Sequence, residues 1–426
     1  MSTGTLFDTL TWRGFVNQYT DPALPELLER EKPFTLYCGF DPTADSLHIG
    51  SLLPILGLAH FQRAGHRPIA LVGGGTGLIG DPSFKAQERA MLSREQVEHN
   101  ARGIRRQLER FLDFEGSRAA LLLNNAEWLC ALPLIEFLRD VGKCFTVNVM
   151  LSRESVRQRI EDREHGMSFT EFSYSLLQAY DFYHLNEHHG CRLQIGGSDQ
   201  WGNIVSGIDL IRRKTGRETY GLTFPLVTKA DGSKFGKTES GNVWLDPTKT
   251  SPYRFYQFWI NQADADVGRY LRYFTFLERE EIEALEQVHA EAPHLRQAQK
   301  KLAEEVTRMV HGSDVLEGAL RATAALFGGD LRGLDEATLL EVFEEAPSAT
   351  IPRDRFGAGT LVDALTDAGV FASKGEARRL IRNGGIYLNG QRIEREDAPW
   401  TSECLLTPSL AVLRVGKKNY HLLRVV

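Results

Sequence analysis

The residues best suited to chemistry in this 426-residue sequence lie at 37–51, which reads Tyr-Cys-Gly-Phe-Asp-Pro-Thr-Ala-Asp-Ser-Leu-His-Ile-Gly-Ser. Residues 34–40 favour a short buried strand, and the pair Asp41-Pro42 breaks that pattern. Residues 47–61 are mostly apolar and predict a helix. Two good N-cap residues precede this apolar run: Asp45 and Ser46.

A strand that turns tightly into a helix is where an open α/β sheet binds nucleotides. The free N–H groups and the dipole of a helix N-terminus favour anions at that point. We therefore expect His48 and Ser51 to reach the phosphate and ribose side of a bound nucleotide. Taken alone, a histidine at this position would more often be a surface group or a satisfied core side chain.

A glycine-rich loop follows a second predicted strand at 68–72. Residues Gly75 to Gly80 match G-x-G-x-x-G, the fingerprint of dinucleotide-binding folds. That fingerprint needs a continuing helix, but Asp81-Pro82 follows at once, so a nicotinamide-dinucleotide site is disfavoured. The glycines instead let the backbone pass close to a ligand and leave Asp81 at the edge of the site.

Three polar side chains share one face of a predicted helix at 171–182. Tyr174, Gln178 and Asp181 stand at i, i+4 and i+7, while the other faces are largely apolar. Polar groups on a buried helix need partners, which can be a ligand or an internal hydrogen-bond network. A solvated face is the third interpretation, and the spacing alone does not decide among them.

Two further loops carry polar residues. A predicted strand at 191–195 leads into Gly-Gly-Ser-Asp-Gln-Trp-Gly-Asn at 196–203, and glycines at a strand end suit a ligand that crosses the sheet edge. After a last predicted strand at 224–228 comes Lys-Phe-Gly-Lys-Thr at 234–238. This is no Walker A motif, because position 231 is aspartate where that motif needs glycine. In isolation, a basic surface hairpin explains the two lysines equally well.

In order and spacing, these segments together resemble the class I aminoacyl-tRNA synthetases, in the form of the bacterial tyrosyl-tRNA synthetases. His-Ile-Gly-Ser at 48–51 is similar to the His-Ile-Gly-His signature, and 234–238 is similar to the Lys-Met-Ser-Lys-Ser signature. Ser51 stands where the family usually has histidine, and it offers one hydrogen bond without an imidazole. Tyr-x-x-x-Gln-x-x-Asp and Gly-Gly-Ser-Asp-Gln-Trp-Gly-Asn also follow the family pattern. The resemblance covers the whole chain.

The resemblance implies a site for L-tyrosine, ATP and Mg²⁺, with no metal held by protein ligands alone. The implied tyrosine contacts are Tyr37 and Asp181 at the phenol, Asp81, Tyr174 and Gln178 at the amino group, and Gln200 near the carboxylate. The implied ATP contacts are Cys38, Gly39, Asp41, His48, Gly50, Ser51, Gly197, Asp199, Lys234 and Lys237. The implied catalytic residues are Thr43, His48, Lys234 and Lys237. They would act by positioning and by stabilising charge on the departing pyrophosphate.

The composition is ordinary for a globular protein, with 42% hydrophobic and 25% charged residues. The five cysteines are scattered and form no C-x-x-C pair, which argues against a disulfide framework and against a zinc site. The N-terminus lacks the pattern of a signal peptide, and no apolar run reaches the length of a membrane span. We therefore expect a cytoplasmic protein that has no membrane contact.

We expect an α/β architecture in which a Rossmann-like nucleotide-binding catalytic domain is followed by two smaller parts. The predicted segments are a catalytic domain at 1–228 with a helical insertion at about 128–194, a mobile signature loop and helical anticodon-stem domain at 229–330, a linker at 331–355, and a small α+β S-four-like RNA-binding domain at 356–426.

Charge is unequally divided along the chain. From Arg353 onward there are 12 Lys and Arg against 8 Asp and Glu, a net +4 that leaves −10 for the preceding residues. Ser373 and Glu376 form a capping-box pattern before a basic helix, and Asn389-Gly390 indicates a type I′ hairpin. The candidate RNA contacts are Arg378, Arg379, Arg382, Lys417 and Lys418. A basic helix that is merely solvated is the alternative.

The resemblance implies that a homodimer attaches L-tyrosine to tRNA(Tyr) in two ATP-dependent steps, through tyrosyl-adenylate. Two alternatives come from other classes. One is a tryptophanyl synthetase or a small-molecule adenylyltransferase; Asp181 with Tyr37 disfavours tryptophan, and the basic tail disfavours the adenylyltransferase. The other is a non-catalytic RNA-binding relative, to which Ser51 lends some support.

Overall fold

The computed structural model spans the 426-residue chain and forms two compact units. One unit, called the N-terminal unit, comprises Met1–Thr250 and Trp259–Val306; the other, the C-terminal unit, comprises Ser251–Phe258 and Thr307–Val426. The structure describes residues 4–83, 91–116, 118–153, 156–157, 160, 166–233, 235–238, 241–326, 328–416 and 419–426.

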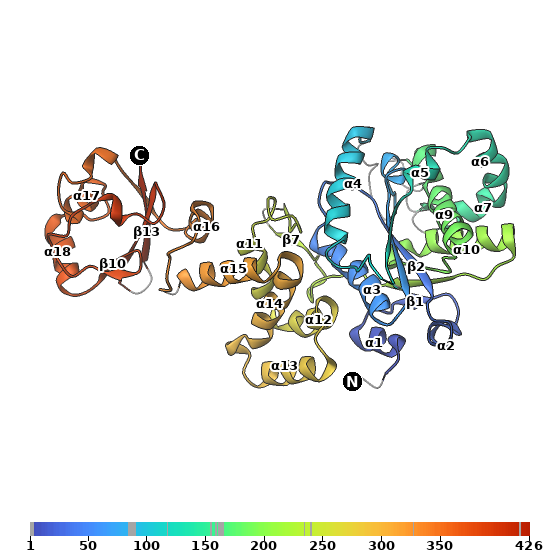
Figure 1. Cartoon of the computed structure of the whole chain (residues 1–426), viewed down its shortest axis with the longest axis horizontal. Helices are drawn as coiled ribbons and strands as arrows, with labels where there is room; N and C mark the ends of the chain where they lie inside the picture. The colour runs from blue at the N-terminus through green and yellow to red at the C-terminus, as the bar shows by residue number, and fades with distance from the viewer. Residues whose placement is uncertain are drawn as a thin grey trace. The chain divides into compact units, whose positions relative to one another are not determined.

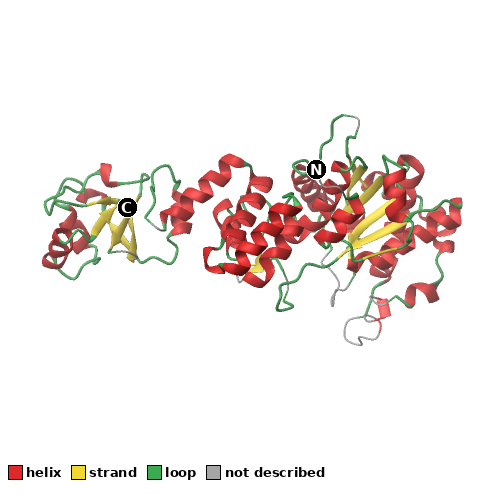
Figure 2. Cartoon of the chain, turned by 90° about the horizontal axis from the view of Figure 1, so that it is seen from below, coloured by secondary structure: helices red, strands yellow, loops and turns green. Residues whose placement is uncertain are grey.

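The N-terminal unit is built on a six-stranded sheet with the order β1-β6-β5-β2-β3-β4, and helices lie on both of its faces (Figure 2). The strands are β1 (Gln18–Tyr19), β2 (Thr35–Phe40), β3 (Arg67–Val72), β4 (Leu121–Asn124), β5 (Leu193–Gly197) and β6 (Tyr220–Phe224). All neighbours pair in parallel except β1, which runs antiparallel to β6. The chain winds outward from β2 in one direction and from β5 in the other, so a crevice forms where these two strands meet.

The helices of this unit follow the strands in the order expected of a doubly wound fold (Figure 1). They are α1 (Leu6–Arg13), α2 (Leu24–Arg30), α3 (Leu52–Arg63), α4 (Arg94–Leu108), α5 (Ala126–Leu129), α6 (Leu134–Asp140), α7 (Val147–Leu151), α9 (Phe169–His189), α10 (Trp201–Thr215), α12 (Asp264–Phe274) and α13 (Arg279–Glu291). Between β4 and β5 the described residues are helical or irregular, as the predicted insertion requires.

The predicted helix start at residue 47 is wrong. Residues Ile49–Ser51 form a short 3₁₀ turn that His48 caps, and α3 begins only at Leu52. The reason is that the backbone of this segment pairs elsewhere: Ile49 N–H donates to Val243 O at 3.0 Å, and Leu245 N–H donates to Leu47 O at 2.9 Å. Asp45 and Ser46 therefore cap no helix.

The last strand of the sheet was also predicted too late, at 224–228. Strand β6 ends at Phe224, because Pro225 has no N–H to donate to a neighbouring strand. The residues after it lead to a turn at Asp231 and to a two-stranded hairpin, β7 (Lys237–Thr238) with β8 (Gly241–Asn242).

Most of the described residues from 252 to 325 are helical. Two helices cross the boundary between the units, namely α11 (Pro252–Ile260) and α14 (Gln297–His311), and α15 (Ser313–Ala325) belongs to the C-terminal unit.

The C-terminal unit contains a five-stranded sheet with the order β11-β10-β12-β13-β9. Its remaining elements are α16 (Glu336–Val342), β9 (Ser348–Ile351), α17 (Leu361–Asp367), α18 (Lys374–Arg382), β10 (Ile386–Leu388), β11 (Gln391–Arg392), β12 (Leu410–Val415) and β13 (Asn419–Val425). Trp400 and the inner faces of α17 and α18 pack against this sheet.

The segment 331–355, predicted as a linker, is part of the folded C-terminal unit. Leu339 and Phe343 are buried in a core that includes Leu410 and Leu422 of the sheet. Strand β9 pairs in parallel with β13 and forms one edge of the sheet. The apolar side chains of this acidic stretch stabilise it by burial, which its composition alone did not indicate.

Candidate active site

A cavity of about 360 Å³ opens at the carboxyl ends of β2 and β5, where the winding of the sheet reverses. Its lining includes fourteen of the predicted site residues: Tyr37, Cys38, Gly39, Asp41, Thr43, Gly50, Ser51, Asp81, Tyr174, Gln178, Asp181, Gly197, Asp199 and Gln200. Residues that are far apart in the sequence thus come together because parallel strands end at one edge of the sheet.

Three predicted residues are not placed in this lining. His48 is exposed, and its Nδ1 accepts a hydrogen bond from Gly50 N–H at 3.0 Å. Lys234 lies outside the described residues. Lys237 lies in β7, but its side chain is outside the described part of the chain.

Asp181 lies at the inner end of the cavity and is only 2% exposed. Its two oxygens accept hydrogen bonds from Trp128 Nε1 at 2.7 Å and from Asn125 Nδ2 at 2.8 Å. Burial raises the pKa of this carboxyl to about 8, although both N–H donors oppose the rise. The group is therefore held in a fixed orientation in an environment that disfavours its charge.

The hydroxyl of Tyr37 is buried beside this carboxyl. Tyr37 is 1% exposed, and among the described residues its Oη has no hydrogen-bond partner. Burial and the nearby Asp181 both raise the pKa of this phenol well above its usual value. A buried hydroxyl without a partner is costly, so this atom is suited to a ligand that carries a hydroxyl of its own.

The cavity lining also holds a chain of amides and carboxylates. Gln200 Nε2 donates to Asp81 Oδ2 at 2.7 Å, and Gln178 Nε2 donates to Gln200 Oε1 at 3.2 Å. Tyr174 Oη donates to Asp41 Oδ2 at 2.7 Å. The predicted helix stripe of Tyr174, Gln178 and Asp181 thus does face the cavity, and it takes part in an internal network at the same time. The Asp81 carboxylate and the neutral acceptors beside it suit an ammonium group.

Backbone and small side chains form the rest of the lining. Burial raises the pKa of the Cys38 thiol to about 12, so this group is a neutral thiol at pH 7. A Cβ on Gly197 would lie 2.4 Å from Asp199 Oδ1, and a Cβ on Gly73 would lie 2.0 Å from Asp41 Oδ1. The glycines therefore let carboxylates approach the backbone where a ligand would cross the sheet edge.

Four residues of this network were not predicted from the sequence: Thr76, Asn125, Trp128 and Asn203. The position of Asn125, directly after β4, could have identified it, because that strand ends at the same edge of the sheet. Asn203 belongs to the Gly-Gly-Ser-Asp-Gln-Trp-Gly-Asn segment but had no predicted role. Trp128 had no local pattern, and only the packing of α5 against α9 brings it to Asp181.

The candidate RNA-binding helix α18 begins at Ser373, as predicted, and Ser373 Oγ accepts from Glu376 N–H at 3.2 Å. In a complete capping box, the Glu376 side chain would accept from Ser373 N–H. Here it accepts instead from the N–H of the preceding residue, Ala372. The type I′ hairpin is confirmed by the φ angles of 53° at Asn389 and 80° at Gly390.

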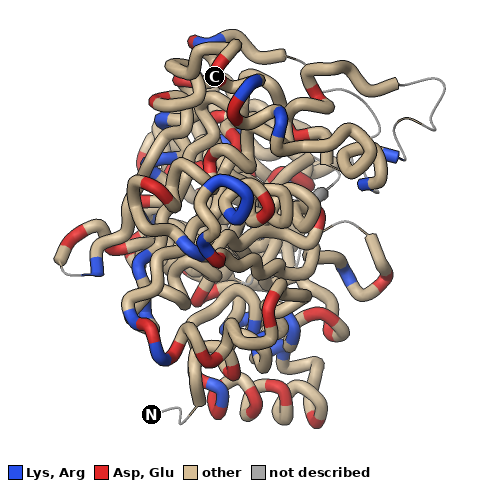
Figure 3. Tube along the Cα trace, turned by 90° about the vertical axis from the view of Figure 1, so that its right-hand side faces the viewer, with Lys and Arg blue, Asp and Glu red and all other residues tan. Residues whose placement is uncertain are grey.

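The arginines of α18 are exposed, but two of them share an acidic partner. Arg382 lies 2.8 Å and Arg378 lies 4.0 Å from Glu396, whereas Arg379 forms no such pair among the described residues. Lys417 and Lys418 lie outside the described residues. Lys and Arg are interspersed with Asp and Glu over the visible trace in Figure 3, and the sequence places the net positive charge from Arg353 onward.

Comparison with known proteins assigns both parts of the chain. Residues 29–328 match the family of tRNA synthetases class I (W and Y), and residues 338–423 match the tyrosine–tRNA ligase SYY-like C-terminal domain. In the described part of the chain, no helix is both long and apolar enough to cross a membrane.

Two curated relatives align over almost their full lengths. The tyrosine–tRNA ligase of Roseiflexus castenholzii is 59% identical over 425 residues, which are 99% of this chain and 100% of the relative. That of Bacillus caldotenax is 57% identical over 422 residues, which are 98% and 99% of the two chains. A C-terminally truncated mitochondrial tyrosyl-tRNA synthetase of Aspergillus nidulans superposes with a TM-score of 0.69 at 32% identity, covering 76% of this chain and 94% of that one.

The class I model includes both tryptophan and tyrosine enzymes, and the C-terminal match together with the full-length relatives decides between them. The tryptophanyl and non-catalytic alternatives are therefore not favoured. The chain belongs to the tyrosine–tRNA ligases, the class I aminoacyl-tRNA synthetases of the tyrosyl type.

Proposed function

We propose that the cavity between β2 and β5 activates L-tyrosine with ATP, and that this ligase then transfers the tyrosyl group to the 3′-terminal adenosine of tRNA(Tyr). The carboxylate of tyrosine attacks the α-phosphate of ATP, which forms tyrosyl-adenylate and releases pyrophosphate. The 3′-terminal ribose hydroxyl then attacks the tyrosyl carbonyl and releases AMP. The observation that carries the proposal is the buried pair of Asp181 and the unpartnered Tyr37 hydroxyl at the inner end of the cavity, in the described part of the chain.

The phenol of tyrosine would reach this inner end. Its hydroxyl can donate to Asp181 and exchange a hydrogen bond with Tyr37, whose Oη has none among the described residues. Phenylalanine would leave the buried Tyr37 hydroxyl without a partner and would bring no donor to Asp181, which disfavours its binding. The tyrosine ammonium group would lie among Asp81, Tyr174 and Gln178, and its carboxylate near Gln200.

ATP would lie along the outer part of the cavity. We assign the adenosine side to the backbone at Cys38 and Gly39 and to Gly197 and Asp199. Thr43 and His48 would hold the phosphates, and Lys234 and Lys237 would neutralise the leaving pyrophosphate. Asp41, Gly50 and Ser51 also line the cavity, and we assign them to the ATP side.

Mg²⁺ would be held largely by phosphate oxygens and water. In the described residues, no three His, Cys, Asp or Glu side chains gather closely enough to bind a metal ion. Mg²⁺ characteristically keeps several waters and binds through substrate phosphates with one or two carboxylates. We assign Asp41 and Asp199, two carboxylates of the cavity lining, to the phosphate and ribose side, where the ion would add to the charge neutralisation.

The C-terminal unit would bind the tRNA backbone through Arg378, Arg379 and Arg382, together with Lys417 and Lys418. The insertion would form a homodimer contact, because several large apolar side chains on it are exposed. They are Leu134, Ile135, Leu138, Val147, Val149, Leu151 and Phe169. We place the enzyme in the cytoplasm, where its tRNA substrate occurs.

The direct test is amino-acid-dependent exchange of pyrophosphate into ATP, followed by charging of tRNA. We expect exchange with tyrosine, at least about 100-fold weaker exchange with phenylalanine, and none with tryptophan. Exchange that is driven by tryptophan, or by neither amino acid in a folded protein, would contradict the proposal.

Tyr37→Phe is expected to separate binding from stability. Removing a buried hydroxyl that has no partner among the described residues should leave the melting temperature unchanged or slightly raised. The same change removes a contact to the tyrosine phenol, so kcat/KM for tyrosine in the exchange assay should fall about 5- to 10-fold, while the value for phenylalanine stays level. A loss of stability with no change in selectivity would show that Tyr37 serves only the core.

Tyrosine affinity is expected to rise with pH. The pKa of Asp181 is raised to about 8 in the free enzyme, so below that pH its carboxyl is largely protonated. An ionised carboxylate accepts the phenol hydrogen bond, and tyrosine binding therefore releases a proton. Affinity should increase by up to about tenfold per pH unit below 8 and level off above it. Equilibrium dialysis between pH 6 and 9 measures the affinity for tyrosine. The Tyr37→Phe variant should show the same dependence on pH as the wild type. A wild-type affinity that does not change with pH would contradict the prediction.

A further inference from the structure

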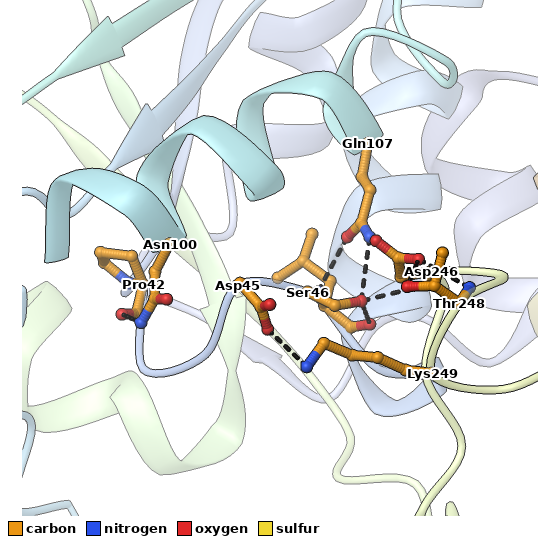
Figure 4. Close-up of polar contacts among 9 residues, drawn as sticks. Pro42, Asp45, Ser46, Asn100, Gln107, Asp246, Thr248 and Lys249 are labelled. Carbon is orange, nitrogen blue, oxygen red and sulfur yellow. Dashed lines mark hydrogen bonds and ion pairs between the residues drawn. The ribbon is translucent and has the colours of Figure 1, made fainter. Parts of the chain in front are cut away.

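The segment between β2 and the 3₁₀ turn, residues 42–47, is held by polar contacts on two sides (Figure 4). On one side lies α4. Asn100 Nδ2 donates to Pro42 O at 3.0 Å, and Gln107 Oε1 accepts from Leu47 N–H at 2.8 Å. The helix also comes very close, since a Cβ on Gly103 would lie 2.0 Å from Asp45 O.

On the other side lies the stretch that follows the β7–β8 hairpin, residues 243–250. Lys249 Nζ lies 2.7 Å from Asp45 Oδ1, and Asp246 N–H donates to Ser46 Oγ at 3.2 Å. The Asp246 carboxylate fixes its own turn by accepting from Thr248 N–H at 2.8 Å and Thr248 Oγ1 at 2.7 Å. The backbone bonds between residues 47–49 and 243–245 continue this contact in strand-like register.

Ser46 joins the two sides through a single atom. Its Oγ accepts from Gln107 Nε2 at 2.9 Å and from Asp246 N–H, and it donates to Leu47 O at 2.8 Å. A hydroxyl has one proton to donate and two lone pairs, so every position on this oxygen is used. Ser46 is 4% exposed, and loss of its hydroxyl would leave donors from two separate segments without their partner.

These contacts connect the segments that carry the two signatures. Residue 46 is two positions before His48, and Val243 N–H donates to Gly236 O at 3.1 Å, inside the Lys-Phe-Gly-Lys-Thr motif. A Cβ on Gly236 would lie 3.1 Å from Ile49 Cγ1, so the two motifs are in direct contact. A shift of residues 243–250 against 42–47 would therefore change the distance between the groups proposed to hold the phosphates.

We propose that Ser46, Gln107, Asp45 and Lys249, together called the brace, are positioning residues for adenylate formation. The brace fixes the segment after the lysine motif in register with the segment before His48, so that both close on ATP together. The inference depends on the proposed roles of His48 and Lys237. None of the four side chains contacts the reacting atoms; they act through the segments that they hold. A misplacement of about 1 Å can cost up to about 100-fold in rate.

The test exchanges the charges of the exposed pair in the brace. Asp45→Lys and Lys249→Asp are each expected to lower kcat/KM for ATP in tyrosine-dependent exchange by about tenfold, and the double variant should recover most of that loss. The KM for tyrosine should stay within about twofold, because the amino-acid side of the cavity is not touched. Transfer of preformed tyrosyl-adenylate to tRNA should also keep its wild-type rate. Only a positioning role predicts both a loss that is confined to the ATP-dependent step and its recovery in the double variant.

The matched control is the ion pair Arg105–Glu109, which joins α4 to the residue after its end at 3.2 Å and has no polar contact with residues 42–47 in the described part of the chain. Reversing the charge of Arg105, of Glu109 or of both should leave kcat/KM for ATP and the KM for tyrosine unchanged. Gln107→Glu adds a second probe, since it keeps the acceptor for Leu47 N–H but loses the donor to Ser46, and its melting temperature reports any folding defect.

The outcomes separate the brace from the proposed function. If the wild type fails to exchange pyrophosphate with tyrosine, the proposed function fails. If the wild type exchanges normally while Gln107→Glu and both single charge reversals match it, the brace has no positioning role. Equal losses in the single and double variants, or a parallel rise in the KM for tyrosine, would likewise overturn the inference.

Discussion

Asp181→Asn is expected to reduce kcat/KM for tyrosine activation by about 100-fold or more, the largest effect that we expect of a single substitution in this enzyme. The amide is isosteric with the carboxylate but has one acceptor instead of two. Trp128 Nε1 and Asn125 Nδ2 both donate to this side chain, so the new NH₂ group must face one of these donors. Asn125 is not free to turn over, because its Oδ1 accepts from Gly75 N–H at 2.7 Å.

The effect should be specific to the hydroxyl of the substrate. Exchange assays with tyrosine and phenylalanine should show that the ratio of their kcat/KM values collapses, while the KM for ATP changes little. Asp209→Asn is the matched control, since Asp209 is half-exposed on α10 and pairs with Arg212. An Asp181→Asn enzyme within about threefold of the wild type would exclude Asp181 from the phenol contact.

Gly103→Ala is expected to give the second largest effect, through packing. An added Cβ would lie 2.0 Å from Asp45 O and 2.9 Å from Asp45 C, and backbone atoms have no other rotamer to adopt. Helix α4 would have to move away from residues 42–47, at a cost of about 1–3 kcal/mol. We expect a lower melting temperature by scanning calorimetry and a higher KM for ATP.

A second glycine provides the control for this change. Gly318 lies in α15, where an added Cβ would meet nothing within 4 Å. Gly318→Ala should therefore stabilise its helix by up to about 1 kcal/mol, because alanine loses less backbone entropy on folding. If Gly103→Ala behaved like Gly318→Ala, the close approach of α4 to Asp45 would be disproved.

Local sequence determined much of this protein. The strands β2, β3 and β5 followed from their apolar runs and the breakers after them, and the I′ hairpin at Asn389 followed from its turn residues. The helical spacing of Tyr174, Gln178 and Asp181 placed all three on one face. Motif similarity along the chain identified the family, because several short patterns occurred together in one order.

For two of the failed predictions, the deciding contacts were between segments distant in sequence. The helix start at residue 47 was wrong because the backbone of Leu47 and Ile49 bonds to residues about 200 positions away. The linker at 331–355 was wrong because Leu339 and Phe343 find their core in strands near the C-terminus.

The active site shows the same division. Asp181 and Tyr37, proposed to recognise the tyrosine phenol, could be predicted from local pattern and resemblance. The partners that orient Asp181 could not. Trp128 and Asn125 reach it only after β4 and α5 are folded against α9. The sequence by itself thus determined which groups do the chemistry, and the tertiary structure decided what holds each of them, because hydrogen bonds of buried side chains depend on neighbours that no local spacing specifies.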